Sequence, residues 1–194
     1  IGNYSSGKMG YALANQLAMR GAQVTLVSGP SSLKIENPLV KLVKVESAQQ
    51  MYEQCVAIFP TVDGAIMSAA VADFTPADPQ PEKIKRKGDE LILALKATKD
   101  IAAELGRIKK SNQLLVGFAL ESQHYEENAI KKLASKNLDF IVLNKAGQEG
   151  VGFNVDTNQI TIIDRQNKQT VFSLKSKVDV AEDIINHIES HMNC

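Results

Sequence analysis

The first ten residues contain side chains suited to binding an anion. Asn3, Ser5 and Ser6 can donate side-chain hydrogen bonds, and Gly7 lets a ligand approach the backbone. Residues 8–20 carry apolar side chains at helical spacing, so this loop runs into the N-terminus of a predicted helix. The unpaired N–H groups and the positive dipole end of such a helix attract anions. A phosphate or a carboxylate is therefore the expected ligand.

Two well-known phosphate-binding loops fit this segment poorly. A P-loop places Ser or Thr after its lysine to hold magnesium, whereas Met9 follows Lys8 here. The dinucleotide fingerprint G-x-G-x-x-G is also missing, because residues 7–10 supply only its G-x-x-G half. One structural alternative stays open, in which a serine of the loop caps the helix and the glycines serve packing.

Composition bounds the class of protein. With 194 residues and 44% hydrophobic side chains, the chain is long enough for one well-filled α/β domain. Lys plus Arg equals Asp plus Glu at 22 each, which argues against nucleic-acid or membrane partners and favours a small molecule. Cys55 and Cys194 form no disulfide framework or metal spacing, and no signal peptide is visible, so we expect a cytoplasmic protein. Because the chain begins within a loop and without Met, we expect a segment upstream of it.

Strand and helix patterns alternate along the chain, which predicts a Rossmann-like, three-layer α/β fold with a mostly parallel sheet. A C-terminal hairpin and a closing helix are expected to complete this single domain. In the helix predicted at 125–136, Ile130, Leu133 and Ala134 are expected to face inward. The expected strands are 23–27, 42–45, 64–70, 91–95, 114–119, 140–143, 159–163 and 170–174, and the expected helices are 8–20, 47–59, 98 or 100 to 109, 125–136 and 178–191.

Residues 75–88 contain three prolines and a run of basic side chains, too polar for a core and too rich in proline for a helix. We expect a mobile flap. Lys83 within it could neutralise charge that develops on a phosphate during group transfer. The alternative is that this basic run is a solvated surface.

Ligands of open parallel sheets bind at the carboxyl ends of the strands. Residues 68–74 comprise the end of the strand predicted at 64–70 and the turn after it. Asp73 there offers a carboxylate for a ribose hydroxyl or a magnesium-bound phosphate, although it could also be a turn residue. Phe118 could lie against a base or belong to the core. Lys132 and Lys136 share a helix face, which solvation alone could explain.

The chain resembles the bacterial phosphopantothenoylcysteine synthetase family over nearly its whole length. The resemblance is carried, in this order, by residues 3–10, 24–30, 69–74, 81–85, 117–121, 136–139 and 150–154. It is similar to the carboxy-terminal half of the bifunctional decarboxylase–synthetase protein, so no FMN is expected in this part.

That resemblance implies a CTP-dependent ligase of coenzyme A biosynthesis. The carboxylate of 4'-phosphopantothenate would attack the α-phosphate of CTP, giving an acyl-cytidylate and pyrophosphate, and the amine of cysteine would then displace CMP. Mg²⁺ is expected with the triphosphate. By similarity to the family, Asn3 would hydrogen-bond the acyl-cytidylate carbonyl, and Lys83 would stabilise charge in the first half-reaction.

The family's nucleotide-binding positions would fall on twelve residues of this chain. They are Met67, Ser68, Ala69, Asp73, Lys83, Lys99, Asp100, Ile101, Ala102, Phe118, Lys132 and Lys136. One departure concerns Lys99, which stands where the family commonly has the proline of Asn-Pro-Asp-Ile. Asp100 could still cap the helix that follows and leave N–H groups toward a phosphate.

The resemblance also implies a homodimer, with residues 154–175 as a candidate dimerisation hairpin. Two other functions are alternatives to the ligase. A dinucleotide or nucleotide-sugar enzyme is disfavoured because no acidic residue ends the strand at 23–27. A non-catalytic nucleotide sensor would need the same loop, but it would not need Lys83.

Overall fold

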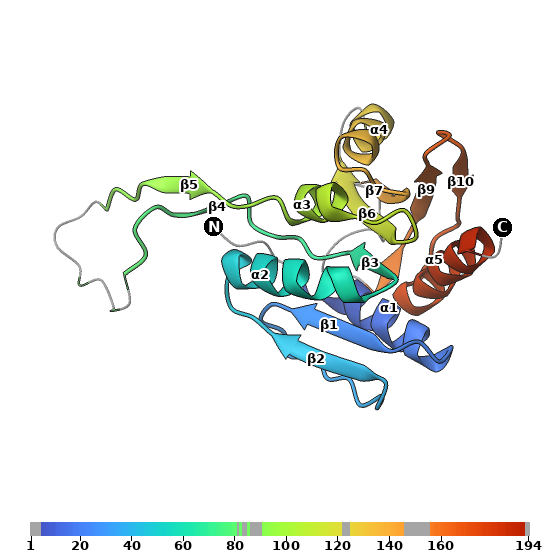
Figure 1. The fold of residues 1–194 in the computed structure, drawn as a ribbon, viewed down its shortest axis with the longest axis horizontal. Helices are drawn as coiled ribbons and strands as arrows, with labels where there is room; N and C mark the ends of the chain where they lie inside the picture. Colours follow the sequence, from blue (N-terminus) through green and yellow to red (C-terminus); the bar gives the residue numbers. More distant parts are fainter. Residues whose placement is uncertain are drawn as a thin grey trace.

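The computed structural model describes residues 5–80, 82, 85, 91–121, 125–145 and 156–192. Its largest sheet has five strands in the order β10–β9–β7–β6–β3 (Figure 1). These strands are β3 (Gly64–Met67), β6 (Leu114–Glu121), β7 (Phe140–Lys145), β9 (Ile160–Asp164) and β10 (Gln169–Val171). β3, β6 and β7 pair in parallel, β9 runs antiparallel to β7, and β10 runs antiparallel to β9. The mostly parallel α/β sheet is confirmed.

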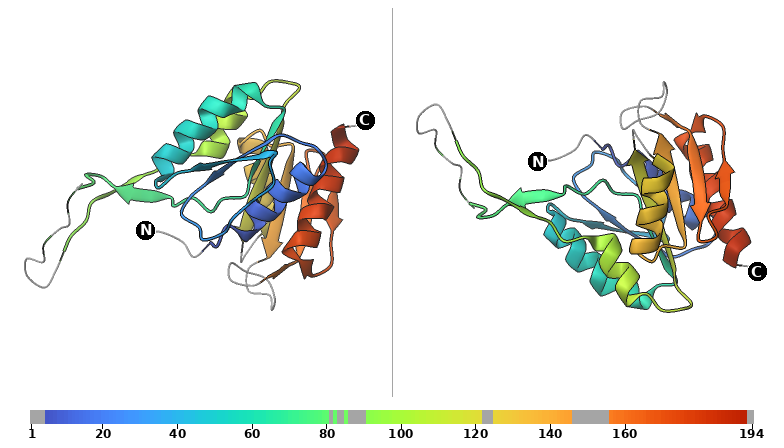
Figure 2. Two further views of the ribbon diagram at one scale, coloured as in Figure 1. Left: turned by 90° about the horizontal axis from the view of Figure 1, so that it is seen from below. Right: turned by 90° about the horizontal axis from the view of Figure 1, so that it is seen from above.

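Helices cover both faces of this sheet (Figure 2). They are α1 (Lys8–Met19) and α5 (Lys177–Met192) on one face, and α2 (Ala48–Ile58), α3 (Ile101–Ile108) and α4 (Tyr125–Ser135) on the other. Alternate residues of a strand face opposite sides, so Leu115 joins the core under α2, α3 and α4, whereas Val116 joins the core under α1 and α5. Two separate hydrophobic cores therefore make the three predicted layers.

The N-terminal half contributes one helix and a pair of parallel strands. After α1, β1 (Val24–Ser28) pairs in parallel with β2 (Val40–Lys44). Ser47 then caps α2 by accepting a hydrogen bond from the Gln50 N–H. In turn, the Gln50 side-chain oxygen accepts a hydrogen bond from the Ser47 N–H. A short 3₁₀ turn, η1 (Phe59–Thr61), follows α2. β3 ends at Met67, three residues earlier than the predicted 64–70, because the small residues after it leave the sheet to line a cavity.

A two-stranded ribbon extends away from the body of the molecule (Figure 1). It pairs β4 (Phe74–Pro76) with β5 (Leu95–Ala97) in antiparallel fashion. The predicted strand at 91–95 is wrong except at its last residue, and Ile92 is 93% exposed. An apolar run becomes a buried strand only where a neighbouring strand and a helix cover it, and among the described residues no strand pairs with 91–94. The flap at 75–88 begins in this ribbon, and its closure stays a prediction.

The C-terminal hairpin is confirmed, with Thr170 opposite Ile162 in β9–β10, but its second strand ends at Val171 and not at the predicted residue 174. β9 lies between β7 and β10, and its isoleucines are at most 2% exposed, so the hairpin is stabilised by its own domain. A further short pair, β8 (Thr157–Asn158) and β11 (Lys175–Ser176), precedes α5. Whether residues 154–175 also reach a second subunit stays a prediction, and part of this range lies outside the described residues.

The prediction that Ala134 of α4 faces inward is wrong. Leu133 is buried and Ile130 packs against the core, but Ala134 is exposed. Ala129, one turn before Leu133, completes the buried face instead. Across the described part of the chain, no helix combines the length and the apolar character that crossing a membrane requires.

Candidate active site

A cavity of about 350 Å³ lies at the carboxyl ends of β1, β3, β6 and β7, beside the start of α1. This is the edge at which open α/β sheets bind ligands. Among the residues that line it are Ser5, Ser6, Gly7, Ser28, Gly29, Ser47, Ser68, Ala69, Ala70, Phe118, Asn144, Asn158 and Lys177. The lining therefore joins the first loop of the chain to residues from its last third.

The loop of Ser5, Ser6 and Gly7 lines the cavity beside the start of α1. Gly7 is the N-cap of α1 with φ 78°, a left-handed conformation that favours glycine. It provides no side-chain cap, so the N–H groups of the first turn depend on other partners. The Ser31 hydroxyl donates to the Ser6 carbonyl over 3.3 Å and holds the loop against the turn after β1. Asn3 lies outside the described residues.

The end of β3 approaches α1 closely. A Cβ at Gly10 would lie only 3.0 Å from the Ser68 hydroxyl oxygen. Ser68 and Ala69 line the cavity, as expected of small residues at this position. Met67 packs against the core under α2, α3 and α4. Asp73 is exposed at the base of the ribbon, where its carbonyl accepts a hydrogen bond from the Thr98 N–H over 2.9 Å.

Phe118 belongs to the core and also reaches the cavity, so its contact with a base stays a prediction. It packs against the core under α1 and α5 and also lines the cavity. A half-buried aromatic ring at this place can support a base or an alkyl chain while its other side stays in the core.

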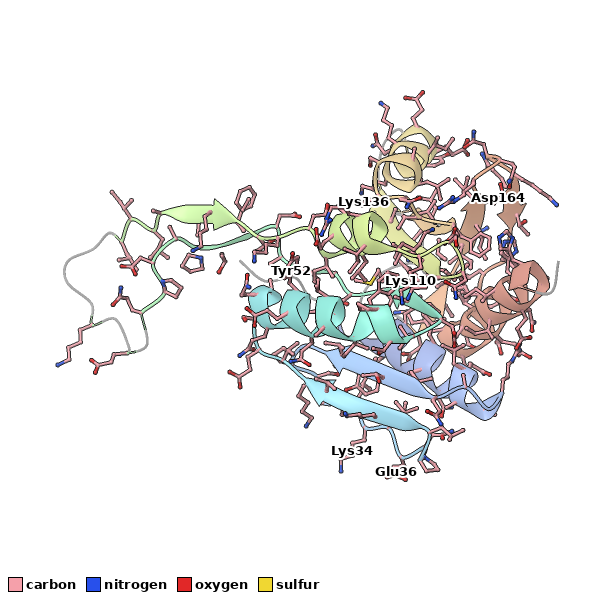
Figure 3. The ribbon with its side chains drawn as sticks, in the orientation of Figure 1. Lys34, Glu36, Tyr52, Lys110, Lys136 and Asp164 are labelled. Atoms are coloured by element: carbon pink, nitrogen blue, oxygen red, sulfur yellow. The ribbon has the colours of Figure 1, made fainter. Side chains whose placement is uncertain are left out.

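Three of the remaining proposed nucleotide residues, Lys99, Asp100 and Lys136, gather at the start of α3, outside the described lining of the cavity. Asp100 caps α3 by accepting a hydrogen bond from the Ala103 N–H over 3.0 Å, and it pairs with Lys136 at 2.9 Å. Lys99 places its ammonium 4.5 Å from the centre of the Tyr52 ring. Tyr52 on α2 and Lys136 after α4 both lie beside α3 (Figure 3).

The set has four further members. Ile101 is 4% exposed and belongs to the core, so it contributes packing. Ala102 and Lys132 are half-buried on α3 and α4. Lys83 lies outside the described residues. The structure thus brings Ser5, Ser6, Gly7, Ser68, Ala69 and Phe118 into one cavity, and it groups Lys99, Asp100 and Lys136 at the start of α3.

The capping carboxylate of α3 has a shifted acidity. Burial alone would raise the pKa of Asp100, but hydrogen bonds from the Ala103 N–H and from Lys136 outweigh it and hold the pKa below its usual value. A carboxyl whose folded-state pKa is lowered stabilises the fold above the ordinary pKa of Asp. That contribution is lost as the pH falls through the lower, folded-state value.

We predict that Asp100→Asn lowers the free energy of unfolding at pH 7 by about 0.5–1 kcal/mol, because asparagine keeps the cap but loses the half-exposed ion pair. Urea unfolding at pH 7 and at pH 3 measures this, and the gap between variant and wild type should narrow at the lower pH. Asp100→Ala serves as the control, since it should lose about 1 kcal/mol more through the cap. A gap that widens on acidification would contradict the lowered pKa.

Among the cavity residues that the sequence did not single out are Asn144, Asn158 and Lys177. Asn144 directly follows the predicted strand at 140–143, so the rule that pointed to residues 68–74 applied to it as well. Lys177 comes just before the predicted helix at 178–191, where a cation opposes the helix dipole. That conflict was the available signal. Asn158 had none, because the fold alone brings it there.

These residues form a polar wall. The Asn158 amide donates to the Asn144 side-chain oxygen over 3.1 Å, and the Asn158 oxygen accepts from the Gln159 N–H over 3.1 Å. Asn158 is 3% exposed and Lys177 is 8% exposed. The Lys177 N–H donates to the Asp156 carbonyl over 2.8 Å, which ties the start of α5 to this wall.

Residues 1–192 match the family of DNA/pantothenate metabolism flavoprotein C-terminal domains. A prokaryotic cysteine/cysteine sulfinic acid decarboxylase is 52% identical over 97% of the chain and 52% of its own length. The coenzyme A biosynthesis bifunctional protein CoaBC is 45% identical in Bacillus subtilis, over 96% of the chain and 46% of that protein. The same protein of Escherichia coli is 40% identical over 97% of the chain and 47% of its length. The chain thus spans about half the length of these relatives.

Solved structures show the same fold. The crystal structure of the C-terminal domain of CoaBC has a TM-score of 0.81 at 37% identity, covering 97% of this chain and 84% of that one. A Cab2 variant in complex with phosphopantothenate-cysteine has a TM-score of 0.74 at 17% identity, covering 100% and 80%, which shows the fold alone. From the match over residues 1–192, the chain belongs to the family of DNA/pantothenate metabolism flavoprotein C-terminal domains.

Proposed function

We propose that this chain is the synthetase part of a coenzyme A biosynthetic enzyme, which joins 4'-phosphopantothenate to L-cysteine at the expense of CTP. The observation that carries the proposal is the cavity at the carboxyl ends of β1, β3, β6 and β7, into which the start of α1 and the Ser5–Ser6–Gly7 loop open. The relatives named CoaBC support the pathway. The decarboxylase name belongs to a protein of which the chain spans about half.

The proposed chemistry needs charge stabilisation more than it needs a nucleophilic side chain. A carboxylate oxygen of phosphopantothenate forms a bond to the α-phosphorus of CTP, and the bond to pyrophosphate breaks. The amine of cysteine then bonds to the acyl carbon, CMP leaves, and the amine loses a proton. Backbone N–H groups at the start of α1 are suited to an anionic group of the substrate, and Lys83 is suited to the charge on the triphosphate. Asn3 would hydrogen-bond the acyl-cytidylate carbonyl.

The nucleotide would extend from the cavity toward α3. Ser68, Ala69 and Phe118 line the cavity and can lie against the nucleoside or the acyl group. Around the start of α3, Lys99 and Lys136 supply cations for phosphate oxygens, and Lys136 would exchange its Asp100 partner for the ligand. Within the described residues, no group of three or more His, Cys, Asp or Glu side chains is placed to hold a metal ion. We therefore assign no protein ligand to Mg²⁺, which would enter with the triphosphate.

Pyrophosphate release in the absence of cysteine tests the proposal. The folded protein is incubated with phosphopantothenate and Mg²⁺ and with either CTP or ATP. Release with CTP supports the acyl-cytidylate step, and release with ATP alone would contradict the choice of nucleotide. No release with either nucleotide would remove the ligase and leave the nucleotide sensor.

The flap lysine separates an enzyme from a sensor. We predict that Lys83→Gln lowers pyrophosphate release by about 100-fold or more, because one preorganised charge contributes about 10²–10³ to a rate. Lys85→Gln is the matched control, since Lys85 is exposed in the same basic run and should keep the wild-type rate. Equal losses in both variants would assign the effect to the net charge of the run.

The homodimer belongs to the same proposal. If the site needs a second subunit, the rate of pyrophosphate release per protein molecule should fall when the protein is diluted below the dissociation constant of its dimer. Activity that stays proportional to concentration in a demonstrated monomer would rule out this requirement.

A further inference from the structure

Asn144 lies near the carboxyl end of β7, on the face of the sheet that α1 and α5 cover. Phe140 and Val142, four and two residues before it, join the core under these helices, and alternate residues of a strand share a face. β7 is paired on both sides, with β6 and with β9. A strand held in this way positions a side chain more precisely than a loop does. Asn144 therefore lines the cavity from a fixed point of the sheet.

The buried side chain of Asn158 fixes the orientation of the Asn144 amide. The Gln159 N–H donates to the Asn158 oxygen over 3.1 Å, so the Asn158 nitrogen points the other way and donates to the Asn144 oxygen, also over 3.1 Å. The Asn144 oxygen is thereby engaged, and its NH₂ group is left for a ligand. This nitrogen meets no acceptor among the described residues, where no buried side-chain nitrogen lacks a partner. The Asn144 donor is therefore open to the cavity.

Apolar side chains lie next to this donor. Leu120 of β6 is directly opposite Asn144 in the parallel pair, and Phe118 is opposite Val142. Leu120 and Phe118 both line the cavity, and Leu120 is 38% exposed. An anionic group placed here would lose hydration against apolar surface and gain one neutral donor. A neutral carbonyl between alkyl groups matches both the donor and its apolar surroundings.

Resting on the proposed function, we infer that Asn144 donates a hydrogen bond to the amide carbonyl in the middle of 4'-phosphopantothenate. This carbonyl is neutral and has alkyl groups on both sides, which pack against Leu120 and Phe118. Asn144 is thus a specificity-determining residue, which selects an acyl chain that contains an amide and takes no part in bond formation. Asn158 is a positioning residue, because it acts only by keeping the NH₂ group of Asn144 turned toward the cavity.

Competing substrates test this assignment in the pyrophosphate assay. One is phosphopantothenate, and the other is its ether analogue, in which CH₂–O replaces C(=O)–NH while the phosphate and the carboxylate are kept. Wild-type protein should prefer phosphopantothenate by about 10- to 100-fold in kcat/KM, because the ether leaves the Asn144 donor without an acceptor. In Asn144→Ala this preference should fall to about 3-fold or less. The change should lie in KM for phosphopantothenate, with kcat nearly constant.

Asn158→Asp gives the same readout with Asn144 in place. A carboxylate at position 158 offers only acceptors, so the Asn144 amide should turn its NH₂ group toward it and present its oxygen to the cavity. The preference for phosphopantothenate over the ether should then be lost, although Asn144 is unchanged. A folding defect in one of the two variants, seen in a thermal melt, leaves the other as the test.

Asn15→Ala is the matched control, because Asn15 is an exposed asparagine of α1 outside the described lining of the cavity and should keep the wild-type preference. A folded Asn144→Ala protein that keeps the wild-type preference, or that loses both substrates equally, would overturn the inference. Wild-type protein that uses both substrates equally well would overturn it too. Wild-type protein that releases no pyrophosphate with phosphopantothenate would instead overturn the proposed function.

Discussion

Gly106→Ala is expected to destabilise the protein by about 3 kcal/mol or more, although alanine is normally favoured over glycine in a helix. The reason is the contact between α3 and the residues after α4. A Cβ at Gly106 would lie 1.9 Å from the Lys136 carbonyl oxygen and 3.2 Å from the Asn137 Cβ. Both neighbours belong to the chain between α4 and β7, so no rotamer change can relieve the clash.

The same contact is reinforced from the other side. Asn137 adopts φ 50°, and its side-chain amide donates to the Gly106 carbonyl over 2.8 Å. The backbone there is held in a left-handed conformation that asparagine tolerates better than most residues. Separating α3 from this turn would break that hydrogen bond and displace Lys136, the partner of Asp100. Under the function proposed above, the substitution should therefore weaken CTP binding as well as stability.

Urea unfolding measures the effect on stability. Gly29→Ala is the control, because nothing lies within 4 Å of a Cβ built at Gly29. It should change the free energy of unfolding by less than about 1 kcal/mol. An unfolding midpoint for Gly106→Ala at or above that of wild type would show that α3 can move away without loss.

Asp139→Ala is expected to lower the free energy of unfolding by about 3–5 kcal/mol, since it leaves a buried ammonium without its counter-charge. Lys109 lies 2.8 Å from the Asp139 carboxylate, and the two side chains are 6% and 15% exposed. The same carboxylate accepts a hydrogen bond from the Leu115 N–H over 2.7 Å at the start of β6. Arg165 approaches it at 3.2 Å from the more exposed side.

Two further variants isolate the cause. Lys109→Met combined with Asp139→Ala should recover part of the lost stability, because the double variant buries no unpaired charge. Arg165→Met should cost less, because Arg165 is 46% exposed and its ion pair is screened by water. If Asp139→Ala alone costs under about 1 kcal/mol in chemical denaturation, water must reach Lys109 and the pair is not a buried one.

One segment that carries the family resemblance also has a structural role. Residues 136–139 join α4 to β7, and three of the four make structural contacts: Asn137 to α3, Leu138 in the core, and Asp139 to Lys109. Only Lys136 extends its charge toward the start of α3. A segment that is typical of the family can therefore be kept for packing rather than for binding.

Local patterns were enough to predict most elements. The apolar stripe of α1, the Ser47 cap of α2 and the alternation in β9 and β10 each depend on neighbours in sequence, and the structure confirms them. The strand expected at 91–95 failed for the opposite reason. Burial decides whether an apolar run joins a sheet, and residues 91–94 have no strand beside them.

The sequence by itself determined the α/β class, and it predicted the loop before α1 and the edge of the sheet as the place of a site, because these follow from periodicity and chain order. Only the tertiary structure decided which distant residues share the cavity. Lys177 is 169 positions from Lys8 in the numbering, yet both line it, because α1 and α5 pack side by side on one face of the sheet. The hydrogen bond between Asn144 and Asn158 has the same origin, because packing, which no local pattern encodes, brings β7 beside β8.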